Sequence, residues 1–500
     1  MDDACDLGRY TRPITAATDT AREETRRGLL WCYGFHHEEA LACFGRALEA
    51  DPDCPLAHWG RAYATGPNYN FHWELMDPAG RAEALAAAHA YTAEALARKA
   101  HASAEERALI EALPMRYPQA EAPEDVAVME GWNANYADAM GAALAAHPGD
   151  LDIRTIYADA LLNLTPWKMW DLGTGRPAPG ARTEEARRVL EAAFAEDPRA
   201  WAHPGLLHMY IHLMEMSPTP EVALRHADAL RGLVPDAGHL QHMPTHIDVL
   251  CGDYAAVVRD NQRAVEADRK DYARSQGMNF YTAYRQHDYH FVIYGALFAG
   301  QMAPALAAAR ELVATTPPAL LEVESPPMAD FLEPYLAFEP HVLVRFGRWR
   351  DCLALPAPAD PELYCTCHAT ILYARGVAHA ALGEVAEAEA AQTEFERARA
   401  AIPETRLLHN NTVVDLMEIA AAMLEGEIAY RRGAHEAAFA ALRRAVALDD
   451  ALPYDEPWGW MQPTRHALGA LLFEQGRVAE AEAVYREDLG LGGTLTRAQI

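Results

Sequence analysis

The chain has 500 residues, of which 51% are apolar, 9% aromatic and 23% charged, so it can bury a large core and lies outside the compositions typical of disordered proteins. Its formal net charge of −29, from 43 basic and 72 acidic residues, argues against a nucleic-acid partner or an anionic membrane surface. No apolar run is long enough to span a membrane, and the first residues, MDDACDLGRY, lack the basic and apolar regions of a secretion signal. We therefore expect a cytoplasmic protein with no nucleic-acid or membrane partner.

Apolar residues at helical spacing run along almost the whole chain, and no stretch shows the alternation of a strand. Helix-start signals support this: Ser103 and Glu106 form a capping-box pattern, and Pro220 directly follows Thr219, which is a good N-cap residue. The sequence therefore predicts an all-α fold.

The first polar candidates lie in the loop after residue 66. Asn68 and Asn70 follow Pro67 there, and short amides in such a loop commonly serve turn geometry. Binding of a substrate by these two amides is the alternative interpretation.

A first pair of histidines lies on the helix expected after His203-Pro204-Gly205. His208 and His212 are four residues apart and therefore share one helix face, and Glu215 lies next to His212 one turn further on. Two histidines four residues apart on a helix have a spacing that is common among metal ligands. Tyr210 lies between them in the sequence, and we expect it to line the groove of the helical array, with a role that is unknown.

A second pair, His242 and His246, repeats the spacing of four. Pro244 lies between them and either starts a helix or kinks one begun at about Ala237. Both geometries keep the two imidazoles near each other.

A third pair, His287 and His290, is three residues apart on the following helix, with Tyr284 as a possible groove neighbour. Nine of the 22 histidines fall between residues 203 and 290. In the helical hairpins described below, three successive hairpins each carry two of these histidines on their first helix. Because packed helices lie about 8–10 Å apart and a metal–imidazole bond is about 2 Å, their side chains can meet at one centre.

Glycine recurs between the end of one helix and an alanine-rich second helix, which indicates helical hairpins. The glycines are Gly252, Gly300, Gly347, Gly383, Gly433 and Gly476. Their spacing is longer than the ideal tetratricopeptide repeat but suits the same unit with lengthened helices or loops. We expect one tetratricopeptide-like solenoid over residues 1–500, a right-handed superhelix of hairpins, with the histidine-rich repeats at 200–300.

Near the C-terminus, Arg465 follows Trp458 and Trp460. It could bind an anionic group of a substrate at one end of the groove, although a packed cap of the array explains it equally well.

Several phrases resemble a family of bacterial tetratricopeptide-repeat proteins of largely unassigned function. They are Tyr33-Gly34-Phe35-His36-His37, His203-Pro204-Gly205, Tyr210-Ile211-His212 and His242-Met243-Pro244-Thr245-His246. His287-Asp288-Tyr289-His290 stands where the family has His-Asn-x-His, so Asp288 is a small departure from the family pattern. The resemblance implies a full-length tetratricopeptide-like fold with the histidines inside its motifs, but it implies no settled reaction.

The ligand types decide which metal we expect. Six neutral nitrogens, from His208, His212, His242, His246, His287 and His290, favour copper, while Glu215, as an extra ligand or a base, keeps iron and zinc open. The first hypothesis is a copper or iron enzyme that uses O₂ to oxidise a small-molecule substrate. The alternatives are a scaffold that binds a protein or peptide in its groove, and a zinc hydrolase in which Glu215 acts as the general base.

Overall fold

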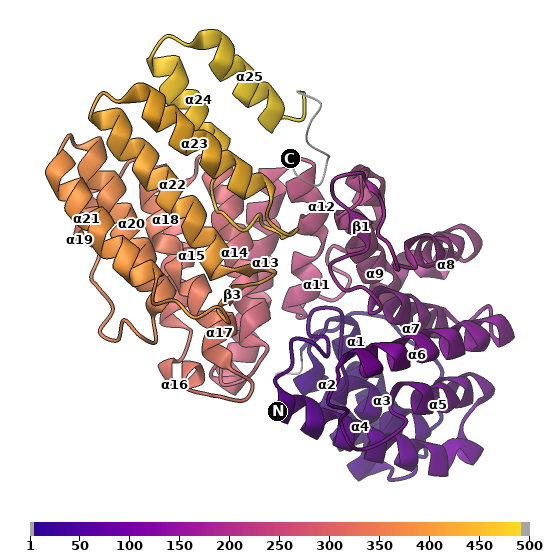
Figure 1. Ribbon diagram of the computed structural model, residues 1–500. Coiled ribbons are helices and arrows are strands. Elements are labelled where there is room, and N and C mark those ends of the chain that lie inside the picture. Colours follow the sequence, from indigo (N-terminus) through magenta and orange to yellow (C-terminus); the bar gives the residue numbers. More distant parts are fainter. Residues whose placement is uncertain (1–4, 492–500) are drawn as a thin grey trace. The chain divides into compact units, whose positions relative to one another are not determined.

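The computed structural model of the chain describes residues 5–491 (Figure 1). These residues form two compact units. Unit 1 comprises the described residues up to Asp171 together with Gly175–Ile247 and Arg263–Arg274, and unit 2 comprises Leu172–Thr174, Asp248–Gln262 and the described residues from Ser275 on. The expectation of one continuous array over 1–500 stays a prediction.

Unit 1 is built from helices that pack in chain order. They are α1 (Asp19–Tyr33), α2 (His37–Ala50), α3 (Pro55–Thr65), α4 (Pro78–Arg98), η1 (Lys99–His101), α5 (Ala104–Arg116), α6 (Ala127–Ala146), α7 (Leu151–Leu162), α8 (Thr183–Glu196), η2 (Pro198–Ala202), α9 (Pro204–Glu215), η3 (Pro220–Ala223), α10 (Leu224–Leu230) and α11 (Gly238–His242). Helices α12 (Pro244–Leu250) and α13 (Tyr254–Ser275) contribute residues to both units.

Unit 2 continues in the same way. Its helices are α14 (Thr282–Phe298), α15 (Met302–Ala314), α16 (Pro318–Leu321), α17 (Met328–Leu332), η4 (Glu333–Ala337), α18 (Phe338–Arg345), α19 (Trp349–Ala354), α20 (Cys365–Ala381), α21 (Val385–Arg399), α22 (Val413–Arg431), α23 (His435–Asp450), α24 (Thr464–Glu474) and α25 (Val478–Asp488). The last three hairpins, α20–α21, α22–α23 and α24–α25, lie side by side in sequence order, from orange to yellow in Figure 1.

The predicted glycine turns are present. Gly300, for example, separates α14 from α15 with φ of 68°, and Gly383 separates α20 from α21 with φ of 80°. Glycine adopts this left-handed conformation at little cost, whereas other residues are strained in it, so the glycine ends one helix and lets the chain reverse into the next. The all-α, tetratricopeptide-like helical-hairpin fold is therefore confirmed, and the hand of a superhelix stays a prediction.

Helix starts follow local chemistry. The Ser103–Glu106 capping box forms at α5. Pro220 opens a short 3-10 helix rather than an α-helix, and its N-cap, Thr219, makes no side-chain capping bond. Both features expected at Pro244 are present in part: a first helix, α11, ends at His242, and a second helix, α12, begins at Pro244. Proline carries no N–H for the preceding turn, so the helix is interrupted there.

The expectation of no strands is wrong for four short segments. Strands β1 (Trp170–Asp171) and β2 (Arg176–Pro177) pair antiparallel, with Trp170 opposite Pro177, and β3 (Leu407–Leu408) pairs antiparallel with β4 (Asn411–Thr412), with Leu407 opposite Thr412. Two residues are too few for an alternating pattern to appear in the sequence.

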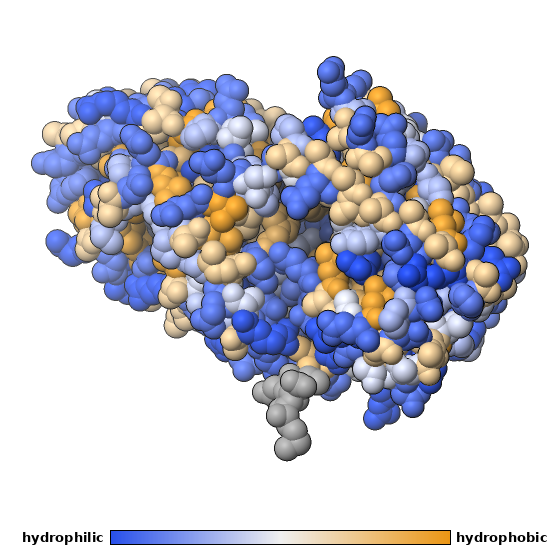
Figure 2. Space-filling model, turned by 90° about the horizontal axis from the view of Figure 1, so that it is seen from below, coloured by the Kyte–Doolittle hydropathy of each residue, from blue (hydrophilic) through white to orange (hydrophobic). Residues whose placement is uncertain are grey.

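Burial follows the helical pattern, and the face seen in Figure 2 is mainly hydrophilic with small, separate apolar groups. Within residues 5–491, no helix has both the length and the hydropathy that crossing a bilayer would require.

Candidate metal centre

Helix α9 of unit 1 carries the first predicted histidine pair. Pro204 occupies its first turn, and the N-cap residue His203 accepts a hydrogen bond at Nδ1 from the N–H of Leu206, at 3.3 Å. His208 and His212 follow on one face, and both are completely buried. The predicted pairing of these two imidazoles is therefore present, with ring centres 4.6 Å apart.

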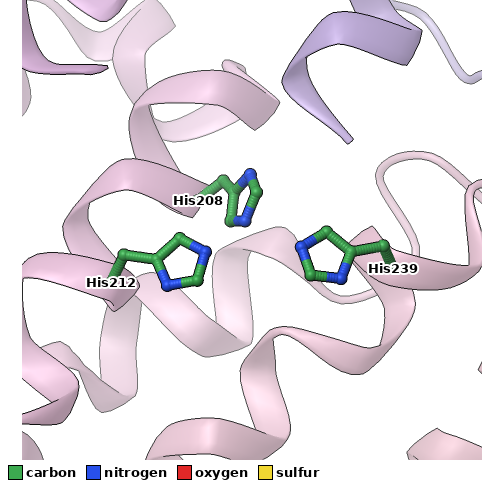
Figure 3. Close-up of side chains that lie close together, drawn as sticks. All are labelled: His208, His212 and His239. Atoms are coloured by element: carbon green, nitrogen blue, oxygen red, sulfur yellow. The ribbon is translucent and has the colours of Figure 1, made fainter. Parts of the chain in front are cut away.

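Helix α11 adds a third imidazole to this pair. One ligand nitrogen from each of His208, His212 and His239 lies within 4.8 Å of the other two, and all three side chains are buried. Figure 3 shows the three rings turned towards a shared space between their helices. Three imidazoles at this separation form the kind of cluster that holds a transition-metal ion.

The backbone of α1 sets the orientation of His208. Its Nδ1 lies 2.6 Å from the carbonyl oxygen of Tyr33, and because a carbonyl only accepts, Nδ1 must donate. The lone pair of the neutral ring is then on Nε2, which is buried and has no hydrogen-bond partner. This is the arrangement of a metal-binding histidine, in which the second ring nitrogen is held by an oxygen.

Glu215 connects His212 of the cluster to a fourth imidazole, that of His246. One carboxylate oxygen lies 2.9 Å from Nδ1 of His212, and the other lies 3.0 Å from Nδ1 of His246. Nε2 of His246 is in turn 2.7 Å from Nε2 of His242. Unit 1 therefore joins four of the six predicted ligands and the predicted carboxylate in one buried network, and Glu215 orients imidazoles through their Nδ1 atoms.

Burial keeps two imidazoles of the cluster, those of His208 and His239, uncharged. It lowers the pKa of His208 well below the ordinary value, and the nearby His212 lowers this pKa further. Burial also lowers the pKa of His239 well below the ordinary value, with His208 and His242 as further causes. Neutral imidazole is the form that coordinates a metal, so these rings need to lose no proton before binding an ion.

Aromatic rings surround the cluster. The Phe35 ring lies 4.6 Å from that of His208, the Tyr69 ring lies 4.7 Å from that of His212, and Trp167 meets His212 edge-on at 5.8 Å. Such walls exclude water, which strengthens electrostatic interactions inside the site.

The third predicted pair lies in unit 2, on α14. Nε2 of His290 is 2.9 Å from the sulfur of Met461, and the ring stacks on Phe338 at 4.4 Å. The His287 ring is 5.3 Å from that of His409, whose Nδ1 bonds to Asp455. The set of six histidines stays a prediction.

The predicted substrate-binding residues have mainly structural partners. Asn68 accepts bonds from the N–H groups of Asn70 and Phe71, at 2.9 and 2.8 Å, and so closes a turn. Tyr210 donates to Glu191 at 3.1 Å. Their roles in substrate binding stay predictions.

Two predicted binding residues lie in unit 2. Tyr284 is buried and stacks on Tyr281 at 5.4 Å. Arg465 pairs with Asp450, one N–O distance being 2.7 Å. The guanidinium of Arg465, which is a candidate for binding an anionic substrate group, thus pairs with a carboxylate of the chain itself. Anion binding by Arg465 stays a prediction.

Sequence reasoning missed His239. The signal was present, because His239, His242 and His246 are spaced by three and four residues. The spacing of four between His242 and His246 predicts only these two as a pair, and His239 lies one further turn towards the N-terminus.

Comparisons with known proteins add the following. No protein-family model matches the chain, and no curated protein matches it. Solved structures with similarity to it include the Cut9–Hcn1 hetero-tetramer of the APC/C, at 12% identity over 90% of this chain and 76% of that chain, with a TM-score of 0.30. Another is Naa15/Naa10 bound to HypK-THB, at 13% identity over 93% of this chain and 68% of that chain, with a TM-score of 0.23. The TPR domain of P58(IPK) is 12% identical over 91% of this chain and 99% of that chain, with a TM-score of 0.20. At these TM-scores the fold assignment rests on the helices of this chain itself.

Proposed function

We propose that unit 1 binds a transition-metal ion through His208, His212 and His239. The observation that carries this proposal is the convergence of three buried imidazoles whose ligand nitrogens lie within 4.8 Å of one another. A metal–imidazole bond is about 2 Å, so two nitrogens on one ion lie at most about 4 Å apart, and small side-chain movements would close the site. The buried Nε2 of His208, which has no hydrogen-bond partner, supports this, since an ion would satisfy it.

The residues around the cluster support this proposal because they fix the orientation of two of the three imidazole rings. A carbonyl holds Nδ1 of His208, and a carboxylate holds Nδ1 of His212. Such partners orient the ring and raise the basicity of the ligand nitrogen. In this proposal Glu215 acts by positioning His212 and His246, rather than as a direct ligand or as a general base.

Copper is the metal that we propose, with iron and zinc as alternatives. The three proposed ligands are neutral nitrogens without a thiolate, which suits copper, and three protein ligands leave a coordination position open for a small molecule. In the oxidase form of the proposal, a small-molecule substrate loses two electrons and two protons to O₂, which leaves as hydrogen peroxide. The aromatic walls of the cluster support a reaction protected from bulk water.

Metal analysis of protein purified without an affinity tag tests the proposal. The chain is reconstituted separately with Cu²⁺, Fe²⁺ and Zn²⁺, desalted and assayed for bound metal and for O₂ consumption. We expect the protein to retain about one equivalent of one metal per chain, and we expect that metal to be copper. Less than about one-tenth equivalent of every metal would contradict the proposal.

A second candidate function is a protein- or peptide-binding scaffold. The observation that favours it is the row of stacked hairpins α20–α25, because repeat arrays of this kind commonly bind partner segments. If no metal binds and a peptide library yields ligands of the full chain, this function replaces the metal proposal. A zinc hydrolase would instead retain zinc and hydrolyse its substrate without O₂.

A further inference from the structure

Unit 2 contains a pocket that lies outside the histidine cluster. Residues from α12, α13, α14, α23, α24 and α25 line it together with the segment 454–463, and its volume is about 70 Å³, enough for a few water molecules. A ligand of a few heavy atoms, or one end of a longer ligand, fits this space.

Aromatic side chains form much of the wall. They are Tyr254, Tyr294, Tyr454, Trp458 and Trp460. Tyr254 and Tyr294 each pack on Phe298, with ring centres 4.7 Å apart, and Trp460 meets Tyr373 at 5.5 Å. These contacts hold the rings in place. Because the face of an aromatic ring is electronegative, such walls attract a positive charge.

Carboxyl groups complete the lining. They are Asp449, Asp450, Asp455, Glu456 and Asp488. Arg465 is the cation of this lining, and it is paired with Asp450, at 2.7 Å between Nη2 and Oδ2. The lining is therefore acidic, although burial raises the pKa of Glu456 well above its ordinary value and keeps that group protonated, so the negative charge comes from the other carboxylates.

Asp449 is the most informative of these groups. It is only 5% exposed, and it accepts hydrogen bonds from neutral donors: Nε1 of Trp458 at 3.0 Å, the hydroxyl of Thr464 at 2.9 Å and the N–H of Thr464 at 3.4 Å. Burial raises the pKa of Asp449 to about 7. A buried carboxylate is costly without a positive partner, and a cationic ligand would supply one.

We propose that this pocket binds a small organic cation, namely an aliphatic ammonium group with the Asp449 carboxylate beside it and the Trp458 ring against its alkyl surface. The aromatic walls favour an ammonium group over a hard metal ion, which prefers a shell of oxygen ligands. The negative lining disfavours anions. The proposal is independent of the metal centre in unit 1.

The test titrates the full-length protein with tetramethylammonium and n-butylammonium, followed by saturation-transfer NMR and calorimetry. Neutral analogues of similar shape, tert-butanol and n-pentanol, are titrated in parallel. We expect the cations to bind about tenfold more tightly than the neutral compounds. Absence of cation binding, or equal binding of cation and neutral analogue, overturns the proposal, and this comparison needs no variant.

Variants then locate the binding. Asp449→Asn keeps the size of the side chain and should weaken tetramethylammonium binding about tenfold. The matched control is Glu474→Gln, which removes one negative charge from an exposed position on α24 and should leave binding unchanged. Trp458→Phe keeps an aromatic ring and should retain more binding than Trp458→Leu. Equal losses in the Asp449 and Glu474 variants would show that only the overall charge matters and would overturn the assigned site.

Discussion

The two units use histidine pairs of similar spacing in different surroundings. On α9 of unit 1, His208 and His212 meet oxygen atoms of Tyr33 and Glu215 at their Nδ1 atoms. On α14 of unit 2, His290 instead meets the sulfur of Met461 and the ring of Phe338. Spacing along a helix thus determines which side chains share a face. The neighbouring helices determine whether the ring nitrogens meet oxygen partners, as in unit 1, or pack among apolar groups.

The oxygen partners in unit 1 change the chemistry of the imidazoles as well as their packing. An oxygen on Nδ1 leaves the lone pair of the imidazole on Nε2 and fixes the direction of that nitrogen. The stacked ring of His290 has a soft sulfur neighbour and aromatic packing. We therefore expect the two histidine regions to respond differently to substitution.

The largest effect should follow from removing ligands in unit 1. The double variant His208→Gln and His239→Gln should reduce bound metal from about one equivalent to less than about one-tenth, because one nitrogen ligand cannot retain the ion. Elemental analysis of tag-free protein measures this. The control is His226→Phe, because His226 is another buried histidine of unit 1 whose ring packs 4.1 Å from Tyr210. Equal metal content in both variants would exclude the assigned ligands.

A smaller effect should come from Glu215→Gln. The amide can accept from one imidazole only, since its NH₂ group faces the other Nδ1–H. We expect metal affinity to fall about 10- to 100-fold, measured by competition with a chelator. Glu191→Gln, which alters a carboxylate of unit 1 bonded to Tyr210, should keep the wild-type affinity. An unchanged affinity in the Glu215 variant would mean that positioning by this carboxylate is unimportant.

Packing of α9 against its neighbours offers a third test. A Cβ at Gly205 would lie 2.6 Å from Cγ2 of Thr155 and 2.8 Å from Cδ1 of Tyr33, so Gly205→Ala should push α9 away from α1. We expect a loss of about 1–3 kcal/mol in the free energy of unfolding, measured with urea. At Gly149 an added Cβ meets nothing within 4 Å, and Gly149→Ala should change stability by less than about 0.5 kcal/mol. Similar stabilities of the two variants would refute the close packing.

The smallest effect should be seen in unit 2. His290→Phe keeps the stacking on Phe338 and should alter stability by less than about 1.5 kcal/mol, without loss of metal. Elemental analysis and urea unfolding measure both quantities. Loss of metal in this variant would instead show that unit 2 supplies a ligand, as the set of six histidines requires.

Much of the fold could be predicted from the sequence because its signals are local. The period of apolar residues specifies helices, and glycines such as Gly300 and Gly383 mark turns that need positive φ. The four short strands could not be predicted because two residues are too few to show an alternating pattern. The division into two units could not be predicted because it depends on contacts between distant segments.

The candidate site was predictable where it lies on one helix. His208, His212 and Glu215 are neighbours on α9, and their spacing in the sequence predicts that they lie close together. His239 comes from another helix, and the carbonyl of Tyr33 belongs to the backbone of α1. The spacing of His239, His242 and His246 indicates that they lie near one another, but no spacing predicts that α11 and the backbone of α1 meet α9, since tertiary packing brings these groups together.

The most direct test of the central claim is anomalous diffraction from crystals of the metal-loaded full-length chain, collected on both sides of the absorption edge of the bound metal. The account predicts an anomalous peak about 2 Å from Nε2 of His208, Nε2 of His212 and one ring nitrogen of His239. A fully loaded protein with its metal elsewhere, and no peak among these three rings, would contradict it.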